Sequence, residues 1–543
     1  MAFPILMVTI CLNALVLIAA YFHSPLLWLG IFTLALLALV IHDMKQTRHA
    51  LWRNYPVLAR GRWLMEEIRP FAQQYLIESE TGGSPINRMF RNIVYQRAKN
   101  NRETVPFGTR VDTYKTGYEW IGHSISALHF NDVNCKPRVK IGSRHCTQPY
   151  EANILNISAM SFGSLSQNAL LALNKGAKLG EFYHNTGEGG ISPYHREHGA
   201  DLVWQVGTGY FGCRTSDGKF DAAAFEKAAR DPQVKMIEIK LSQGAKPGHG
   251  GILPASKNTI EIAEIRGVEP GVEVDSPPFH SAFSSPLELI EFIQSLRKLS
   301  GGKPIGFKLA IGRKSEFMAI CKAMKQLDDG PDFITVDGGE GGTGAAPLEY
   351  TNSIGSPLRE ALAFVDDALR GFGLRDEIKL IASGKIISGF HLVKNLAIGA
   401  DICNSARGMM LALGCVQSLS CNTNRCPTGV ATQDPKLSKG LVPEDKYERV
   451  FNFQQKTVHA AVDILTSAGI RSPHEVNRTH IFRRVSQEQV KRYDQVFPMV
   501  ESGSFLKGDI PERYQLDVAE SSAHSFMPNV QLTEINEKPQ AVS

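Results

Sequence analysis

The sequence has little cysteine, no strong excess of either charge and no basic run. Its nine cysteines in 543 residues are an odd number, which does not fit the disulfide framework of a secreted protein and indicates a reducing compartment. A net charge of +5 is slight for this length, and basic and aromatic residues do not alternate. Nucleic acid is therefore not expected as a partner. The length allows two or three domains, or one large domain with additions.

Charge is absent altogether from two segments near the amino terminus, residues 5–22 and 25–42. Each has 18 residues, the lower limit for crossing a bilayer, and the break YFHSP between them predicts a helical hairpin. A cleaved signal peptide or buried helices are the alternatives, but no basic region precedes the first segment. The basic residues that follow predict an anchor in the cell membrane with the catalytic part facing the cytoplasm. They are Lys45, Arg48, Arg53, Arg60 and Arg62.

The rest of the chain divides into three regions by pattern. We expect the anchor at 1–45, a helical and irregular region at 46–150, a barrel at 151–480 and a carboxyl-terminal extension at 481–543. In the barrel region, short β-rich apolar runs end in Gly, Ser, Asn or Asp and alternate with helical stretches. This alternation predicts an α/β fold, a (β/α)8 TIM barrel, with a doubly wound sheet as the alternative. The expected strands are 154–160, 182–187, 203–207, 236–241, 304–310, 332–338, 378–384 and 401–406.

The ends of the last two expected strands suit a phosphate group. Small residues there allow backbone N–H groups to converge on an anion, and barrels often bind phosphate after strands seven and eight. Simple turns are the alternative reading of the same glycines. The residues concerned are Ser383, Gly384 and Lys385 after one strand, and Ser405, Ala406 and Arg407 after the other.

Three glycines, Gly339, Gly341 and Gly344, formally match the G-x-G-x-x-G pattern of dinucleotide-binding folds. Such a pattern must lead directly into a helix. Here it leads into AAPLEYTNSIGSP, which contains two prolines. We therefore expect no nicotinamide site.

Two lysines, Lys240 and Lys308, occur within runs that otherwise suit a barrel interior. A buried lysine is costly unless an anion accompanies it. The pair could stabilise negative charge on a reduced flavin or on a substrate carboxylate. The alternative is a structural ion pair with a neighbouring Asp or Glu.

Three of the nine cysteines fall within the stretch CVQSLSCNTNRC, residues 415–426. A zinc site normally needs four ligands, and a disulfide would leave one thiol over. Three thiolates in one loop suit a [3Fe–4S] cluster with one cysteine on each iron, and chance clustering is the alternative. The predicted ligands are Cys415, Cys421 and Cys426.

Six motifs between about residues 150 and 440 together resemble the FMN-binding synthase barrel of the glutamate synthase large subunit. They are ISAMSFGSLS, HNTGEGG, IKLSQGAKPGHGG, DGGEGGTGAAP, GADICNSARGMMLALGC and CNTNRCPTGVATQDP. The resemblance implies FMN in the barrel and a [3Fe–4S] cluster on the three cysteines. It also implies an oxidoreductase acting on CH–NH2 donors, which reduces 2-iminoglutarate, formed from 2-oxoglutarate and ammonia, to L-glutamate.

The resemblance also assigns roles to individual residues. Gln243 and Lys246 would hold the 2-oxoacid, with Lys308 and Gln205 near the flavin, and Glu188 of HNTGEGG would join the catalytic set. The implied cofactor-binding residues are Ala159, Met160, Ser161, Gln205, Lys240, Lys308, Gly338, Gly339, Ser383, Gly384, Lys385, Ser405, Ala406 and Arg407.

The chain also departs from the family pattern. Tyr210 replaces an arginine, His249 a glutamate, and Ser281 and Ala282 a histidine and an aspartate, all around the expected substrate side. No glutaminase domain is expected, so ammonia would come from solution or from a separate glutaminase, as in short membrane-anchored members of the family.

The departures leave a second function open. It is a membrane-anchored FMN and iron–sulfur oxidoreductase that acts on a different amino or 2-hydroxy acid and exchanges electrons with a quinone or ferredoxin. In either case the electron donor, whether ferredoxin, quinone or a reductase subunit, is not identified by the sequence.

Overall fold

The computed structural model describes residues 1–101 and 103–529. The chain divides into two compact units, one of residues 1–88 and one that begins at residue 89. We describe each unit by itself.

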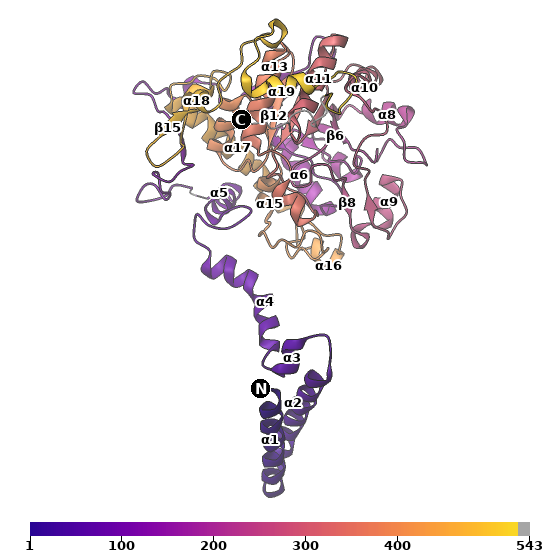
Figure 1. The fold of residues 1–543 in the computed structure, drawn as a ribbon, viewed down its shortest axis with the longest axis vertical. Coiled ribbons are helices and arrows are strands. Elements are labelled where there is room, and N and C mark those ends of the chain that lie inside the picture. The colour runs from indigo at the N-terminus through magenta and orange to yellow at the C-terminus, as the bar shows by residue number, and fades with distance from the viewer. Residues whose placement is uncertain (102, 530–543) are drawn as a thin grey trace, which may run out of the picture. The chain divides into compact units, whose positions relative to one another are not determined.

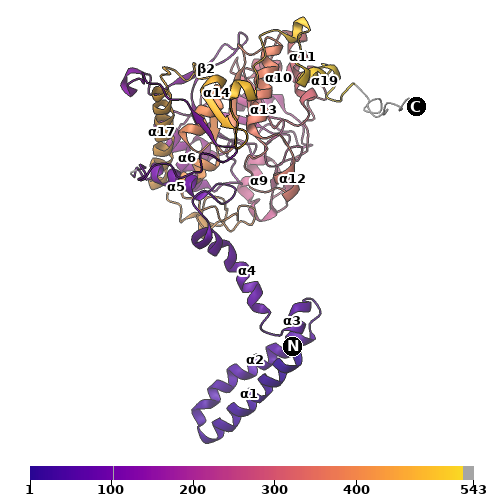
Figure 2. The ribbon, with the colours of Figure 1, turned by 60° about the vertical axis from the view of Figure 1, so that its left-hand side comes forward.

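The first unit begins with an antiparallel pair of apolar helices, α1 (Ala2–Phe22) and α2 (Leu27–Lys45), joined by the 3-10 turn η1 (Ser24–Leu26) (Figure 2). Both are long and apolar enough to cross a membrane. Inside the pair, the Asn13 amide donates to the Thr33 carbonyl at 2.9 Å, and the Thr33 hydroxyl donates to Asn13 Oδ1 at 2.9 Å. These bonds join the two helices by buried polar groups, while most of their large apolar side chains are exposed.

A short linker of helices follows: α3 (Ala50–Asn54), α4 (Arg60–Ala72) and the π-helical turn η2 (Gln73–Ile77). The buried carboxylate of Asp43, near the end of α2, accepts from the Arg60 guanidinium at 2.6 Å and from the Val57 backbone N–H at 3.0 Å. These bonds fix the turn between the hairpin and α4.

The second unit contains a closed barrel of eight parallel strands, in the order β10-β11-β12-β13-β4-β5-β6-β7 (Figure 1). All eight expected strands are present, so the (β/α)8 prediction is confirmed and the doubly wound alternative is wrong. Nearly all residues of these strands are buried, as expected for a parallel sheet that is covered on both faces. The strands are β4 (Leu155–Ile157), β5 (His184–Asn185), β6 (Leu202–Val206), β7 (Val234–Lys240), β10 (Ile305–Leu309), β11 (Phe333–Asp337), β12 (Lys379–Ser383) and β13 (Ile402–Ser405).

Several helices around the barrel begin at a side-chain cap. Ser166, Asp221, Thr259, Ser285 and Ser388 each accept a hydrogen bond from a backbone N–H of the first turn, which satisfies one otherwise unpaired donor. The helices are α6 (Gln167–Gly180), α7 (Pro193–Arg196), α8 (Ala222–Ala229), α9 (Ile260–Arg266), α10 (Pro286–Leu299), α11 (Lys314–Leu327), α12 (Leu348–Ser353), α13 (Leu358–Gly371), α14 (Gly389–Ile398), α15 (Arg407–Leu413), α16 (Pro435–Ser438) and α17 (Pro443–Ser467).

A buried carboxylate lies in the barrel interior. Glu238 of β7 accepts from the Asn185 amide at 2.8 Å, from the Gln205 amide at 2.7 Å and from the Thr335 hydroxyl at 2.5 Å. Three neighbouring donors therefore satisfy the one carboxylate, as a buried charge requires.

Further elements pack on the barrel from both ends of this unit. A sheet of order β1-β14-β15 joins residues before the barrel to residues after it, and β1 and β14 are antiparallel. The domain boundaries expected from the sequence stay predictions. The additional elements are α5 (Arg88–Ala98), β1 (Glu119–Ile121), β2 (Arg138–Ile141), β3 (Tyr150–Asn153), β8 (Ile252–Leu253), β9 (Val274–Asp275), β14 (Ile481–Arg484), β15 (Val490–Arg492), α18 (Tyr493–Val496) and α19 (Glu512–Glu520).

Candidate active site

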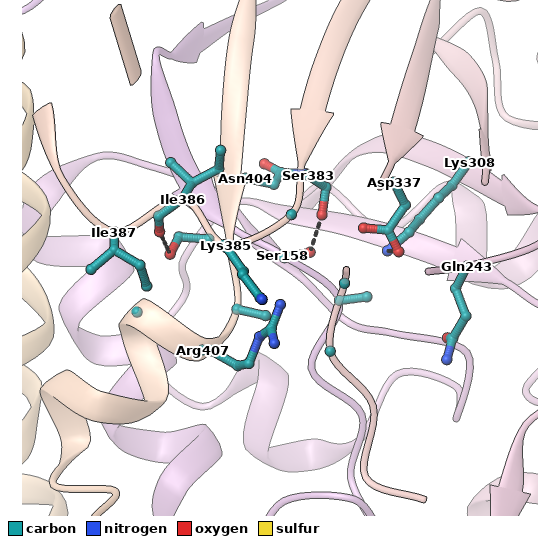
Figure 3. A pocket seen from close by; sticks show the side chains of 17 residues that line it. Ser158, Gln243, Lys308, Asp337, Ser383, Lys385, Ile386, Ile387, Asn404 and Arg407 are labelled. Carbon is teal, nitrogen blue, oxygen red and sulfur yellow. Dashed lines mark hydrogen bonds and ion pairs between the residues drawn. The ribbon is translucent and has the colours of Figure 1, made fainter. Parts of the chain in front are cut away.

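A pocket opens at the carboxyl ends of the barrel strands, where a barrel enzyme carries its chemistry (Figure 3). It brings together residues from loops that are far apart in the sequence. The residues singled out from the sequence that line it are Ala159, Gln243, Lys308, Ser383, Gly384, Lys385, Ser405, Ala406 and Arg407.

Lys385 and Arg407 make one side of the pocket positively charged. Their charged ends lie close to each other in Figure 3. Arg407 donates to the Glu340 carbonyl at 2.7 Å. Among the described residues, neither cation has a carboxylate within 4.0 Å. Burial and the charge of Arg407 lower the pKa of Lys385. Lys385 is exposed and Arg407 is half-buried, and two adjacent cations without a counter-charge suit an anionic group such as a phosphate.

The opposite side of the pocket holds Lys308, whose Nζ lies 3.2 Å from Oδ2 of Asp337. The same oxygen accepts from the Gly244 backbone N–H at 2.8 Å. Burial opposes the charge on Lys308, but the nearby carboxylates, Asp337 first, raise its pKa. Lys308 is therefore ion-paired, as one reading of the sequence allowed, and it still lines the pocket.

Lys240 is also ion-paired: its Nζ lies 2.8 Å from Oε1 of Glu188. The other oxygen of Glu188 is buried and has no hydrogen-bond partner. Burial works to raise the pKa of Glu188, but Lys240, Lys246 and Arg266 outweigh it and lower the pKa. Glu188 is thus an ionised carboxylate among three cations.

Two of these cations have no carboxylate within 4.0 Å in the part of the chain that the structure describes. Lys246 donates to the Ala345 carbonyl at 3.2 Å, and burial lowers its pKa to about 8. Arg266 donates to the Phe162 carbonyl at 3.0 Å, its Nε has no partner, and burial lowers its pKa to about 10. The three cations outnumber the carboxylate of Glu188, and Asp275 offsets part of the positive charge on the side of Lys246.

Arg266 was not singled out from the sequence. It ends helix α9 and is buried, four residues after the buried Ile262. The sequence does contain a signal by which Arg266 could have been found, an arginine on the apolar face of a short helix. A charged residue at such a position needs a buried partner.

The other predicted residues lie in three places. Gln243 lines the pocket, and its amide contacts the Thr343 hydroxyl at 3.4 Å. Gln205 is directed to Glu238 inside the barrel instead. The predicted cofactor residues Met160, Ser161, Gly338 and Gly339 belong to the loops that follow β4 and β11.

The residues that depart from the family pattern do not all lie in one place. The buried Tyr210 hydroxyl bonds His280 Nδ1 at 3.1 Å and accepts from the Ala282 N–H at 3.1 Å, and His280 Nε2 bonds the Lys240 carbonyl at 2.9 Å. These contacts connect the loop of Ala282 to strand β7. His249 instead contacts the ring of Tyr350, with ring centroids 5.3 Å apart.

The three cysteines lie in the loop between α15 and α16. Burial raises the pKa of Cys415 to about 12, and negative charge on Cys421 and Cys426 adds to the rise. The Tyr95 hydroxyl donates to the Cys415 carbonyl at 2.7 Å. Residues 1–101 and 103–529 hold no group of three that would bind a single ion. Ligation of separate irons by one cysteine each does not require such a group.

Comparisons with known proteins agree on one family. A conserved region in glutamate synthase matches residues 89–471. The glutamate synthase large subunit-like protein YerD of Bacillus subtilis is 37% identical over 493 residues, 84% of this chain and 93% of YerD. An archaeal-type glutamate synthase [NADPH] of Thermotoga neapolitana is 36% identical over 316 residues, 58% of this chain and 59% of that protein. The match to a solved mandelate oxidase, at 14% identity and a TM-score of 0.41, covers 79% of this chain and 94% of that one and is too distant to bear on function.

Proposed function

Because the chain belongs to the glutamate synthase family, whose members are oxidoreductases acting on CH–NH2 donors, we propose that it reductively aminates 2-oxoglutarate to L-glutamate. The reaction would pass through 2-iminoglutarate, formed from the 2-oxoacid and ammonia. The chain spans about three fifths of the archaeal-type relatives that it matches, so their NADPH dependence is not carried over.

The observation that carries this proposal is the pair of buried cations near Glu188, Lys246 and Arg266. Lys246 and Arg266 are buried cations whose hydrogen bonds go to carbonyls, and burial makes such groups costly until an anion joins them. A 2-oxoacid with two carboxylates supplies two negative charges. 2-Oxoglutarate would therefore offer one carboxylate to each cation, whereas a monocarboxylate would reach only one of them.

FMN is the cofactor that family membership supports, and the pocket residues fit it. Lys385 and Arg407, with the small residues Ser383, Gly384, Ser405 and Ala406, would hold its phosphate. Ala159, Met160, Ser161, Gly338 and Gly339 would line the rest, beside Lys308 and Lys240. When bound, FMN would supply the hydride that reduces the imine.

The remaining residues would bind and orient the substrate. Lys246 and Gln243 would hold a carboxylate by charge and by an amide hydrogen bond. Glu188 would stay ionised and hold the Lys240 ammonium at 2.8 Å. Lys308 would face the negative charge that reduction adds to the flavin.

A [3Fe–4S] cluster on Cys415, Cys421 and Cys426 would complete the set of cofactors. The three thiols lie in one loop after the last barrel strand, between α15 and α16. The cluster would supply electrons one at a time from the donor.

We further propose that α1 and α2 anchor the chain in the cell membrane, with the barrel in the cytoplasm, since basic residues follow α2. Ammonia would come from solution or from a separate glutaminase. The electron donor would be a ferredoxin, a quinone or a reductase subunit.

One observation favours a second candidate. Tyr210, Ser281 and Ala282, which depart from the family pattern, meet at His280 behind Lys240. Altered contacts there would suit oxidation of a different amino or 2-hydroxy acid, with electrons passed to a membrane quinone or a ferredoxin.

The test is an anaerobic assay of the purified full-length chain with ammonium and a chemical reductant. 2-Oxoglutarate and pyruvate are compared as substrates. The proposal expects glutamate from the first at a much higher kcat/KM than alanine from the second, since the second carboxylate meets its own cation. Equal kcat/KM values, or no amino acid from either, would contradict it.

A further inference from the structure

Lys257 is a buried ammonium that the reaction above does not use. Its side chain is 2% exposed, and its Nζ donates to the Ser164 carbonyl at 3.1 Å. No described carboxylate lies within 4.0 Å of it. Removing an ammonium from water without a counter-charge costs several kcal/mol, so the fold is expected to supply an anion nearby.

The neighbours of Lys257 identify where that anion would be. Lys257 ends a one-turn 3-10 helix, η4 (Ala255–Lys257), and the preceding carbonyl, of Ser256, accepts from the Asn424 amide at 2.8 Å. Asn424 belongs to the cysteine loop, which η4 therefore contacts directly.

The turn is also connected to the flavin side of the barrel. Lys257 binds the Ser164 carbonyl, and the Gln433 amide binds the carbonyls on either side, of Gly163 at 3.1 Å and of Leu165 at 2.8 Å. The loop that carries these carbonyls follows β4 and begins beside Ser161, a predicted FMN-binding residue. Lys257 thus lies between the cysteine loop and the loop that would line the flavin.

We propose that Lys257 is a positioning residue that sets the reduction potential of the iron–sulfur cluster, an inference that rests on the cluster proposed above. Adding one electron to a cluster held by three thiolates adds one negative charge to it. A fixed cation in a buried place stabilises the reduced form more than the oxidised form. Lys257 therefore raises the potential and favours electron entry from the donor.

The experiment measures the cluster potential in the detergent-solubilised full-length chain. A redox titration follows the electron paramagnetic resonance signal of the oxidised cluster in the wild type and in three variants. Lys257→Met removes the charge and keeps the length, Lys257→Arg keeps the charge, and Lys436→Met removes an exposed ammonium shortly after the cysteine loop.

We expect Lys257→Met to shift the reduction equilibrium about tenfold toward the oxidised cluster, which is about 59 mV for one electron. Lys257→Arg and Lys436→Met should stay near the wild-type potential. If Lys257→Met does not bind iron while Lys257→Arg does, the result also supports an effect of the positive charge at position 257 on the cluster.

Two results would overturn the inference. An unchanged potential in Lys257→Met, with iron and sulfide at wild-type levels, refutes it and leaves the cluster intact. Loss of iron from both Lys257 variants assigns the residue to the shape of the turn instead. If the wild type contains no iron or sulfide, and the Cys421→Ser variant has the same flavin content as the wild type, the cluster itself is refuted. The inference about Lys257 is then refuted with it.

Discussion

Lys246 is the residue whose ionisation should govern substrate binding. Burial lowers its pKa to about 8, and the protonated form is the one that attracts a carboxylate. As pH rises through this pKa the charge is lost, so kcat/KM for 2-oxoglutarate should fall about tenfold per pH unit above about pH 8. Below that pH, the charge is present and this fall is absent.

The measurement is kcat/KM for 2-oxoglutarate in the wild type and in Lys246→Arg across about pH 6 to about pH 9.5. Arginine remains charged over this range, so the fall should disappear in the variant even if its absolute kcat/KM is lower. The same alkaline fall in both proteins would assign it to another group.

Lys308 makes a second prediction at this scale. Lys308→Met should leave FMN bound and lower its midpoint potential, because a cation beside the pocket is lost. A loss of about 1–3 kcal/mol corresponds to roughly 20–60 mV for two electrons. The potential is measured by a spectroscopic redox titration at full FMN occupancy.

The ion pair with Asp337 supplies the control for this experiment. Lys308→Met also leaves Asp337 unpaired, and that negative charge alone would lower the potential. The double variant with Asp337→Asn removes both charges. A potential still below wild type identifies a direct effect of Lys308, whereas a return to wild type limits its role to pairing with Asp337.

Sequence reasoning found the residues at strand ends and, through the family motifs, Gln243 and Lys246 after β7, but it did not find Arg266 or the role of Lys257. Lys385 and Arg407 follow recognisable strands, so their convergence follows from barrel geometry. Arg266 and Lys257 lie on short helical elements whose place is set by how the chain after β7 folds back. That path depends on tertiary contacts, such as the Asn424 bond to Ser256, which leave no periodic pattern.

Among the elements, the end of α13 is held by a buried charge network that reaches the residues after the barrel. Arg478 of η5 (Arg478–His480) pairs with Asp366 at 3.0 Å and with Asp367 at 2.9 Å, and all three side chains are 1% exposed. Tyr514 of α19 also donates to Asp367, at 2.9 Å. The carboxyl-terminal segment is thereby bound to the helix layer of the barrel.

Arg478→Met should therefore destabilise the fold by about 3–5 kcal/mol, because two buried carboxylates lose a shared partner. The check is the urea midpoint of the detergent-solubilised chain. Arg513→Met is the matched control, since Arg513 pairs with the same Asp367 at 3.3 Å but is 39% exposed, and it should cost less than about 1 kcal/mol. Equal midpoints for the two variants would contradict the network.

Element prediction succeeded where a strand was a continuous apolar run. The eight barrel strands combine such runs with Gly, Ser, Asn or Asp at their ends. The short strands β1, β14 and β15 were not predicted, because they lie outside the alternation of strands and helices that marked the barrel strands. The pairing of β1 with β14 also joins residues more than 350 positions apart. Tertiary packing, not local sequence, determines that sheet.

The whole molecule contains an apolar helical pair and a barrel enzyme. The enzyme would receive electrons from a separate donor and ammonia from solution or from a separate glutaminase. The helical pair followed directly from two uncharged segments. A decisive test should therefore be independent of the electron donor.

A single turnover of the pre-reduced enzyme meets this requirement. The full-length chain is reduced anaerobically, freed of excess reductant, and mixed with 2-oxoglutarate and 15N-labelled ammonium. The account predicts about one labelled glutamate per FMN and reoxidation of the flavin at the same rate. Unlabelled ammonium with amide-labelled glutamine should give no labelled glutamate. A flavin that stays reduced with 2-oxoglutarate and ammonium, but is reoxidised by a quinone, would contradict the proposed synthase activity.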